Sequence, residues 1–247
     1  MLAIIAPARL ASTRFPEKLL YPIKGKPLIL WVAERLQEQV PEIPRYFAVD
    51  DLRLEAVLRD AGHKTITTRD DHTCGTDRLA EANEKIGAEW LINVQGDEPL
   101  VTRGQILALE SLLKEGAFMA TLATPFITRA DFLDPNQVKV VMDTAQNALY
   151  FSRAGIPHDR DGHEIFDDDW VARAPAYRHL GLYGYRADFL RTYCSLPKGK
   201  LETVERLEQL RVLENGYDIK VALTNELSIG IDTLNDAALF EEHLNRI

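Results

Sequence analysis

Short apolar runs alternate with amphipathic segments over the first half of the chain. Pro27 stands where proline suits a first helical turn, and Gly62 stands where a helix is expected to end. Thr102 and Gln105 have the spacing of a capping box. We expect strands at residues 2–5, 45–50, 64–68, 90–94 and 119–125, and helices at residues 27–39, 52–62, 76–86 and from 102 onward. This alternation with short connections predicts an α/β fold with a doubly wound, mostly parallel sheet.

The pattern changes after about residue 138. Residues 138–143, 148–153 and 179–186 are strand-like with no full helix between them, which predicts an added antiparallel portion. Residues 201–215 predict one helix with Leu207 and Leu210 as core contacts, Val204 on the same side and Gln209 opposite. A strand at 219–224 and a helix at 236–244 follow. The stretch 158–177 is long and irregular, and we expect a lid or arm there.

Composition narrows the class of protein. The 247 residues are 46% hydrophobic and 27% charged, which is ordinary for a soluble globular protein with a real core. A net charge of −9 argues against general nucleic-acid binding, although it leaves room for a local phosphate site. The cysteines Cys74 and Cys194 indicate a reducing compartment. We see no apolar run long enough to span a bilayer, so we expect a cytoplasmic protein with no membrane partner.

A cationic loop follows the first predicted strand. Arg9, Arg14 and Lys18 would neutralise a triphosphate there, and the hydroxyl of Ser12 would donate a hydrogen bond to it. Ligands of open α/β sheets bind beyond the carboxyl ends of strands, which is where this loop lies. A solvated surface loop with scattered cations would give the same pattern. The glycines of a P-loop are absent, so the loop belongs to a different class of phosphate site.

Two aspartates complete a candidate metal–triphosphate site. Asp97 follows the predicted strand at 90–94, after Gly96, which would let a ligand approach the backbone closely. Asp232 follows a short apolar and glycine run. Carboxylate oxygens suit Mg²⁺, which shares its ligands with phosphates, whereas an ordinary turn aspartate is the alternative for each residue. The histidines and aspartates between residues 158 and 169 match no zinc spacing, so we expect a solvated loop there.

The chain resembles the 3-deoxy-manno-octulosonate cytidylyltransferases (CMP-Kdo synthetases). From about residue 4 to residue 239 it carries, in the family's order, the segments RLASTRFPEK, CGTDR, NVQGDEP, VKVVMD, ALYFSRAGIP, YRHLGLYGYR, LEQLRVLENG and GIDT. The resemblance implies a nucleotidyltransferase fold of the glycosyltransferase-A type. It implies one such domain over residues 1–247, with a sugar-binding and dimerisation subregion at about 138–215, and a homodimer.

The same resemblance implies a reaction and its residues. CMP would pass from CTP to the anomeric hydroxyl of 3-deoxy-D-manno-octulosonate (Kdo), releasing pyrophosphate, for lipopolysaccharide synthesis. Asp97 and Asp232 would hold Mg²⁺, with Lys18 as a third catalytic residue, and Arg78 would assist near the nucleotide. The sugar acid would contact a set of polar residues, namely Gln95, Arg153, His179, Tyr183, Glu208 and Gln209.

The chain departs from the family pattern at four places, and two kinds of alternative stay open. Glu17 replaces a glycine, Val49 a threonine and Cys74 a serine, and Leu234 begins the replacement of a Pro-Glu pair. Glu17 matters most, because it adds a negative charge beside the expected phosphates. The enzyme alternatives are cytidylyltransferases for an amino-substituted Kdo or for sialic acid. The alternative of another class is a non-catalytic nucleotide- or sugar-binding regulator.

Overall fold

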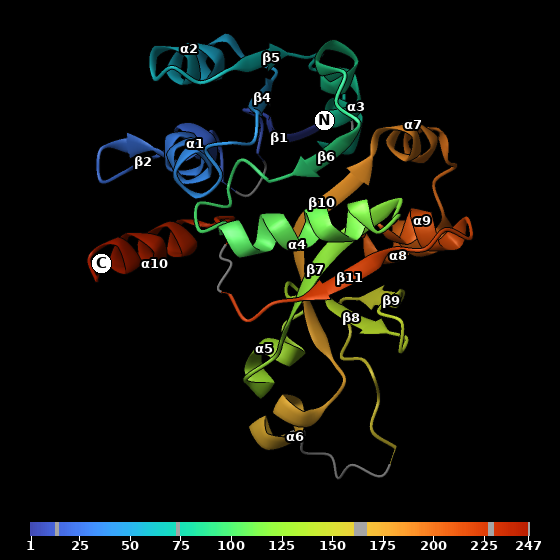
Figure 1. Cartoon of the computed structure of the whole chain (residues 1–247). Helices are drawn as coiled ribbons and strands as arrows, with labels where there is room; N and C mark the ends of the chain where they lie inside the picture. Colours follow the sequence, from blue (N-terminus) through green and yellow to red (C-terminus); the bar gives the residue numbers. More distant parts are fainter. Residues whose placement is uncertain (13–14, 73–74, 161–166, 227–229, 247) are drawn as a thin grey trace. The chain divides into compact units, whose positions relative to one another are not determined.

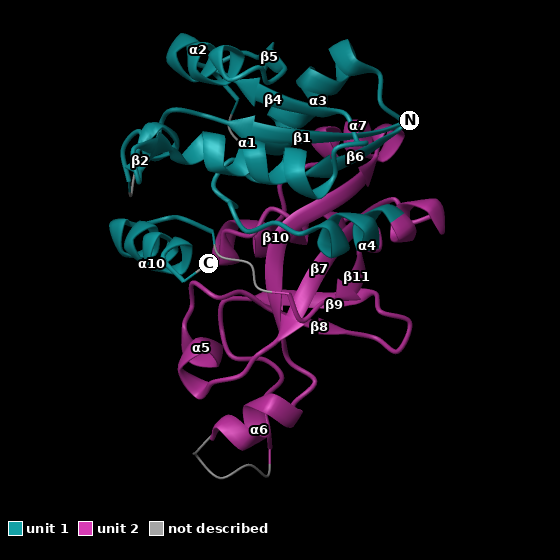
Figure 2. Cartoon of the chain, turned by 60° about the vertical axis from the view of Figure 1, so that its left-hand side comes forward, with its two compact units in different colours: residues 1–110, 227–247 teal, residues 111–226 magenta. Residues whose placement is uncertain are grey.

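Two compact units make up the chain. The computed structural model describes residues 1–12, 15–72, 75–160, 167–226 and 230–246. One unit contains Met1–Glu110 and Leu227–Ile247, and the other contains Ser111–Glu226 (Figure 2). The predicted subregion at about 138–215 lies inside the second unit. No helix in the described part of the chain is long and apolar enough to cross a membrane.

The first unit contains four parallel strands. They are β1 (Leu2–Ala8), β4 (Arg45–Val49), β5 (Thr65–Thr67) and β6 (Trp90–Asn93), paired in the order β6-β1-β4-β5. Apolar residues make up most of β1 and β6, as expected for strands that are covered on both faces. The helices α1 (Leu28–Gln39) and α3 (Gly75–Ile86) lie on opposite sides of these strands (Figure 1). The prediction of a doubly wound parallel sheet is therefore confirmed.

Helix ends in this unit follow the side chains that cap them. α2 (Leu52–Asp60) begins after Asp51, whose carboxylate accepts the Arg53 N–H at 2.7 Å. The predicted capping box before α4 (Arg103–Lys114) is present, because Thr102 and Gln105 exchange backbone-to-side-chain hydrogen bonds. The unit also contains the short elements η1 (Lys18–Leu20), β2 (Pro22–Ile23) and β3 (Lys26–Pro27), and the longer helix α10 (Leu234–Leu244).

The second unit carries the predicted antiparallel portion. β10 (Tyr177–Arg186) pairs antiparallel with both β7 (Met119–Pro125) and β8 (Lys139–Met142), and β9 (Ala148–Ser152) pairs antiparallel with β8. β11 (Lys220–Leu223) runs parallel to β7. Between Leu180 and Tyr183 the register of β10 on β7 shifts, which marks a bulge. The helices of this unit are α5 (Arg129–Leu133), α6 (Asp168–Arg173), α7 (Ala187–Ser195), α8 (Lys200–Glu205) and α9 (Leu210–Glu214).

The prediction of one helix over residues 201–215 was wrong. Arg206 has a left-handed backbone, with φ of 55°, and it separates α8 from α9. Leu207 and Leu210 are core residues as predicted, but Val204 is 82% exposed and Gln209 is buried. A helical wheel that ignores the break at Arg206 places Val204 on the buried side and Gln209 on the exposed side, the reverse of what the structure has. Within the stretch 158–177, which was expected to be irregular, the described residues Asp168–Arg173 form the helix α6.

Candidate functional site

The candidate site of the first unit lies where the order of strands in the sheet changes direction. β4 and β5 extend the sheet to one side of β1, and β6 pairs on the other side, so β1 and β6 flank a topological switch point. Open α/β sheets bind ligands beyond the carboxyl ends of such strands. Gly96 follows β6 and packs so closely that a Cβ would lie 3.2 Å from the Pro7 carbonyl oxygen. The segment after β6 therefore lies directly against the end of β1.

Lys18 joins the two predicted metal ligands. Its ammonium donates to the Asp97 carboxylate in a short ion pair, and it lies 2.8 Å from Asp232 Oδ1. The side chain of Lys18 is 13% exposed, against 21% for Asp97 and 47% for Asp232. Burial by itself would lower the pKa of Lys18, but the charges and hydrogen bonds of the two aspartates raise it above its ordinary value. The lysine is therefore charged at neutral pH.

Backbone contacts hold the two aspartates near each other. The Ile231 N–H donates to the Asp97 carbonyl oxygen at 3.0 Å, which ties the segment before Asp232 to the segment after β6. Asp236 accepts from the N–H groups of Asp232 and Thr233 as part of the capping box of α10. Two residues more than 130 positions apart in the sequence are therefore held together by the cap of α10 and by the backbone hydrogen bond between Ile231 and Asp97.

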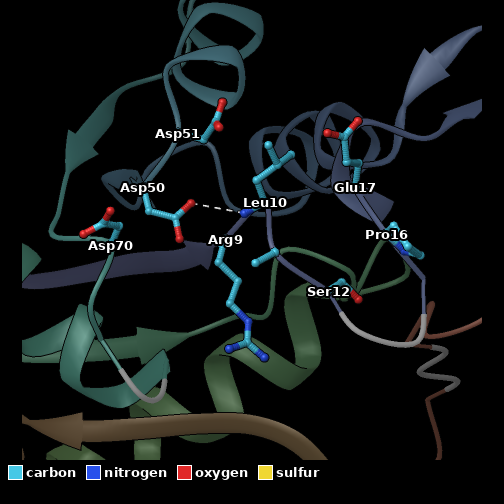
Figure 3. Close-up of a pocket in the computed structure, with 9 residues that line it drawn as sticks. Arg9, Leu10, Ser12, Pro16, Glu17, Asp50, Asp51 and Asp70 are labelled. Atoms are coloured by element: carbon cyan, nitrogen blue, oxygen red, sulfur yellow. Dashed lines mark hydrogen bonds between the residues drawn. The ribbon is translucent and has the colours of Figure 1, made fainter.

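Two adjoining cavities are lined by the basic loop. The smaller, about 220 Å³, is lined by Lys18, Gln95, Asp97 and Asp232 together with Arg9 and Ser12. The larger, about 580 Å³, shares Arg9 and Ser12 and adds four carboxylates, which belong to Glu17, Asp50, Asp51 and Asp70. Figure 3 shows the Arg9 side chain extending away from the carboxylates of Asp51 and Glu17. Each of the described loop residues predicted to bind phosphate lines the smaller cavity.

Arg78 contacts the basic loop indirectly, through Asp50. Its guanidinium is buried and donates to Asp50 at 2.9 Å and to the Thr68 hydroxyl. Asp50 also accepts the Leu10 N–H at 3.1 Å, a bond drawn in Figure 3. The buried pair therefore fixes the backbone at the start of the loop. Asp50 was not predicted as a site residue, although its position at the end of the expected strand at 45–50 was a signal that it belongs to the site.

The departures from the family pattern have local structural correlates. Glu17 has φ of 53°, the left-handed region that favours glycine, and its carboxylate pairs with Arg53 at 2.8 Å. Val49 is fully buried at the end of β4. Leu234 is the first residue of α10. Cys74 and the predicted phosphate ligand Arg14 lie outside the described residues.

The second unit gathers several of the predicted sugar-acid residues. The rings of His179 and Tyr183 lie 5.4 Å apart, and Tyr183 stacks on Tyr185, which stacks on Tyr193. The Tyr193 hydroxyl donates to the carbonyl oxygen of Glu208 at 3.0 Å. Burial, together with the negative charge of Glu208, raises the pKa of Tyr183. An aromatic row therefore connects strand β10 to the turn before α9.

His179 is held as a neutral ring. Burial lowers its pKa to about 3, because the positively charged imidazolium is poorly stabilised away from water. The Thr121 hydroxyl donates to the Leu182 carbonyl oxygen and lies 3.0 Å from Nε2 of His179. The Thr121 hydroxyl therefore shares a hydrogen bond with Nε2 of His179, which orients the ring. Gln209, the next predicted contact, is buried at the start of α9.

Arg153 is engaged with main-chain oxygens. Its Nε donates to the Glu205 carbonyl at 2.8 Å, and its terminal nitrogens lie 3.0 Å from the Pro135 oxygen and 3.5 Å from the Arg206 oxygen. The Glu205 carboxylate in turn accepts the Arg153 N–H and the Ser152 hydroxyl. Arg153 thus braces the left-handed turn that separates α8 from α9.

Residues 3–219 match the family model described as cytidylyltransferase. The chain belongs to the cytidylyltransferase family. A 3-deoxy-manno-octulosonate cytidylyltransferase of Syntrophotalea carbinolica is 46% identical, over 97% of each chain. An 8-amino-3,8-dideoxy-manno-octulosonate cytidylyltransferase of a Shewanella species is 41% identical, over 98% of this chain and 97% of the relative. A solved CMP:2-keto-3-deoxy-manno-octonic acid synthetase complexed with CTP has a TM-score of 0.89 at 35% identity, over 99% of this chain and 98% of that one.

The two aspartates of this cytidylyltransferase suit a divalent cation. Their carboxylates already turn toward one positive centre, the ammonium of Lys18. Mg²⁺ characteristically takes one or two carboxylates and completes its shell with water and substrate phosphates. No larger cluster of histidine, cysteine, aspartate or glutamate gathers as a metal site within the described ranges. Asp97 and Asp232 therefore fit an ion that is shared with a nucleotide rather than one enclosed by protein.

Proposed function

We propose that this cytidylyltransferase transfers CMP from CTP to the anomeric hydroxyl of Kdo and releases pyrophosphate. The observation that carries the proposal is the convergence of Lys18, Asp97 and Asp232 beside the basic loop, in a chain whose relatives are named for this reaction. Displacement at a phosphate of this kind depends on positioning and charge neutralisation, with no covalent enzyme intermediate. Mg²⁺, a homodimer and a cytoplasmic location follow from the family resemblance and are part of the proposal.

The basic loop binds the triphosphate in this proposal. Arg9 and Lys18 supply positive charge from the wall of the smaller cavity, and Ser12 supplies a hydroxyl donor. Arg14 is a further proposed phosphate ligand. Arg78 orients the loop through Asp50, so its effect on CTP binding is indirect. Bound at Asp97 and Asp232, Mg²⁺ would neutralise charge on the α-phosphate and lower the pKa of the attacking hydroxyl.

The sugar acid is proposed to bind polar side chains that are already held in place. Neutral His179 and the hydroxyl of Tyr183 offer hydrogen bonds to hydroxyl groups, and Glu208 and Gln209 stand beside the aromatic row. Gln95, which lines the smaller cavity, is a further proposed contact of the sugar acid. If one of these partners is removed, a polar group of the bound sugar acid loses its hydrogen bond, at a cost of about 1–3 kcal/mol.

Pyrophosphate release from CTP and Kdo tests the proposal. Asp97→Asn and Asp232→Asn should each lower turnover by about 10²-fold or more while circular dichroism stays unchanged, because each removes a metal-binding charge. Asp188→Asn is the matched control, since that aspartate pairs with Arg186 in the second unit and is 56% exposed. EDTA should abolish activity and Mg²⁺ should restore it. Full activity in metal-free buffer would contradict the proposal.

A second candidate substrate is 8-amino-3,8-dideoxy-manno-octulosonate. The relative named for that sugar is 41% identical over nearly the whole chain, close to the 46% of the relative named for Kdo. The two sugars differ at one substituent, a hydroxyl against an amine, so kcat/KM for each under the same conditions separates the candidates. Sialic acid in the same assay tests the more distant alternative. CTP binding with no pyrophosphate from any of the three would favour a regulator.

A further inference from the structure

We propose that Lys18 is a displaceable counter-ion that occupies the metal position in the metal-free protein and moves to the phosphates when a divalent cation binds. The inference rests on the proposed metal site at Asp97 and Asp232. It adds to that site a competition between two cations for the same oxygens, together with a second position for Lys18.

The contacts of the ammonium identify the shared position. Lys18 Nζ contacts Asp97 Oδ2 and Asp232 Oδ1, one oxygen from each carboxylate. A divalent cation bound to both side chains takes oxygens at about 2.0–2.1 Å, whereas an ammonium hydrogen-bonds at about 2.7–2.9 Å. A single point between the two oxygens cannot hold both cations. One positive centre must leave before the other binds.

Charge explains why the position is filled in the absence of metal. Asp97 and Asp232 would repel each other if they were brought together without a cation, and Asp97 is largely shielded from solvent. The lysine supplies one positive charge against two negative ones, so a net charge of −1 remains at the site. A divalent cation in its place neutralises the two carboxylates completely. The lysine then contributes an additional positive charge for the ligand.

The structure also offers the displaced lysine a destination. The smaller cavity is lined by Lys18 together with Arg9 and Ser12, the residues proposed to bind phosphate. A lysine has a flexible four-carbon stem and a compact charge, so its ammonium can move several ångströms while the backbone stays in place. Metal binding would thus complete the phosphate site by releasing Lys18 into it. This order of events makes metal and nucleotide binding mutually supportive.

Binding of Mn²⁺ without nucleotide, followed by electron paramagnetic resonance, tests the inference. Lys18→Met keeps the length of the stem and removes the competitor, so it should bind Mn²⁺ about tenfold more tightly than the wild type. Arg9→Met removes a charge from the same cavity and controls for long-range electrostatics, so its affinity should change by less than about threefold. Asp97→Asn should lose binding. Equal or weaker Mn²⁺ binding by Lys18→Met, or an equal gain in Arg9→Met, overturns the inference.

A second measurement uses the wild-type protein, in case Lys18→Met folds poorly without metal. In crystals soaked with Mn²⁺, anomalous scattering should place the ion between Asp97 and Asp232, with Lys18 Nζ withdrawn from both. An ion there with Lys18 still bonded to both carboxylates overturns the inference but leaves the metal site intact. Failure of the proposed function is distinguishable, because it appears as pyrophosphate release that is independent of metal.

Discussion

Glu17 provides a test in which backbone strain and charge can be separated. Its φ of 53° lies in the left-handed region, where a side chain other than glycine costs about 1–2 kcal/mol. Glycine at the same position loses about 0.5–1 kcal/mol of backbone entropy on folding. Glu17→Gly and Glu17→Ala both remove the ion pair with Arg53, so that pair cancels when they are compared. The glycine variant should therefore be more stable than the alanine variant by about 0.5–1 kcal/mol.

Urea denaturation of both variants, under identical conditions, measures this difference. For a chain of this size the same difference corresponds to about 1–4 °C in Tm. Glu38 provides the matched control, because it is exposed near the end of α1 and also takes part in an ion pair, with Arg35. There the order should reverse, with Glu38→Ala more stable than Glu38→Gly by about 1 kcal/mol. A glycine variant at position 17 that is less stable than the alanine variant would refute the reasoning.

The same variants bear on nucleotide binding. Glu17 would oppose the triphosphate if its carboxylate faced the phosphates, and Glu17→Gly would then tighten CTP binding. The carboxylate instead pairs with Arg53, although the residue lines the larger cavity. We expect the Kd for CTP, measured by calorimetry, to change by less than about twofold, because an exposed ion pair screens the charge. Tighter binding of about tenfold would show that Glu17 acts on the ligand.

Three further predictions concern the second unit and Gly96. The folded protein holds the pKa of His179 at about 3, whereas this histidine protonates near pH 6.5 in the unfolded chain, so protonation favours unfolding. The free energy of unfolding should therefore fall by up to about 2 kcal/mol between pH 6.5 and 5. Comparing denaturation curves of the wild type and His179→Gln over this pH range isolates the contribution of His179. Arg153→Ala should raise the KM for Kdo at least tenfold with little change in the KM for CTP, because it frees the turn before Gln209, and Arg153→Lys should rescue only in part. Gly96→Ala should lower kcat at an unchanged far-ultraviolet spectrum, since the added Cβ pushes against the Pro7 carbonyl beside Asp97.

Much of the fold could be predicted because its signals are local. The parallel strands of the first unit are short apolar runs, and their helices begin and end at residues such as Asp51 and Thr102, whose side chains cap the backbone. The division of residues 201–215 into two helices could not be predicted in this way. Arg206 carries no sequence signal for a left-handed backbone, and the carbonyls that Arg153 braces come from a segment about 50 residues away.

The candidate site could likewise be predicted from the sequence only in part. Asp97, Asp232 and Lys18 could be nominated because strand ends, glycines and a cationic loop are visible in the sequence. Their convergence on one ammonium depends on tertiary contacts, namely the Ile231–Asp97 backbone bond and the cap at Asp236. Family resemblance assigned Lys18 to catalysis without indicating that it would bind the proposed metal ligands. That contact joins the loop to the proposed metal site through one residue, so the affinity for a divalent cation should depend on Lys18 far more than on Arg9, which lines the same cavity.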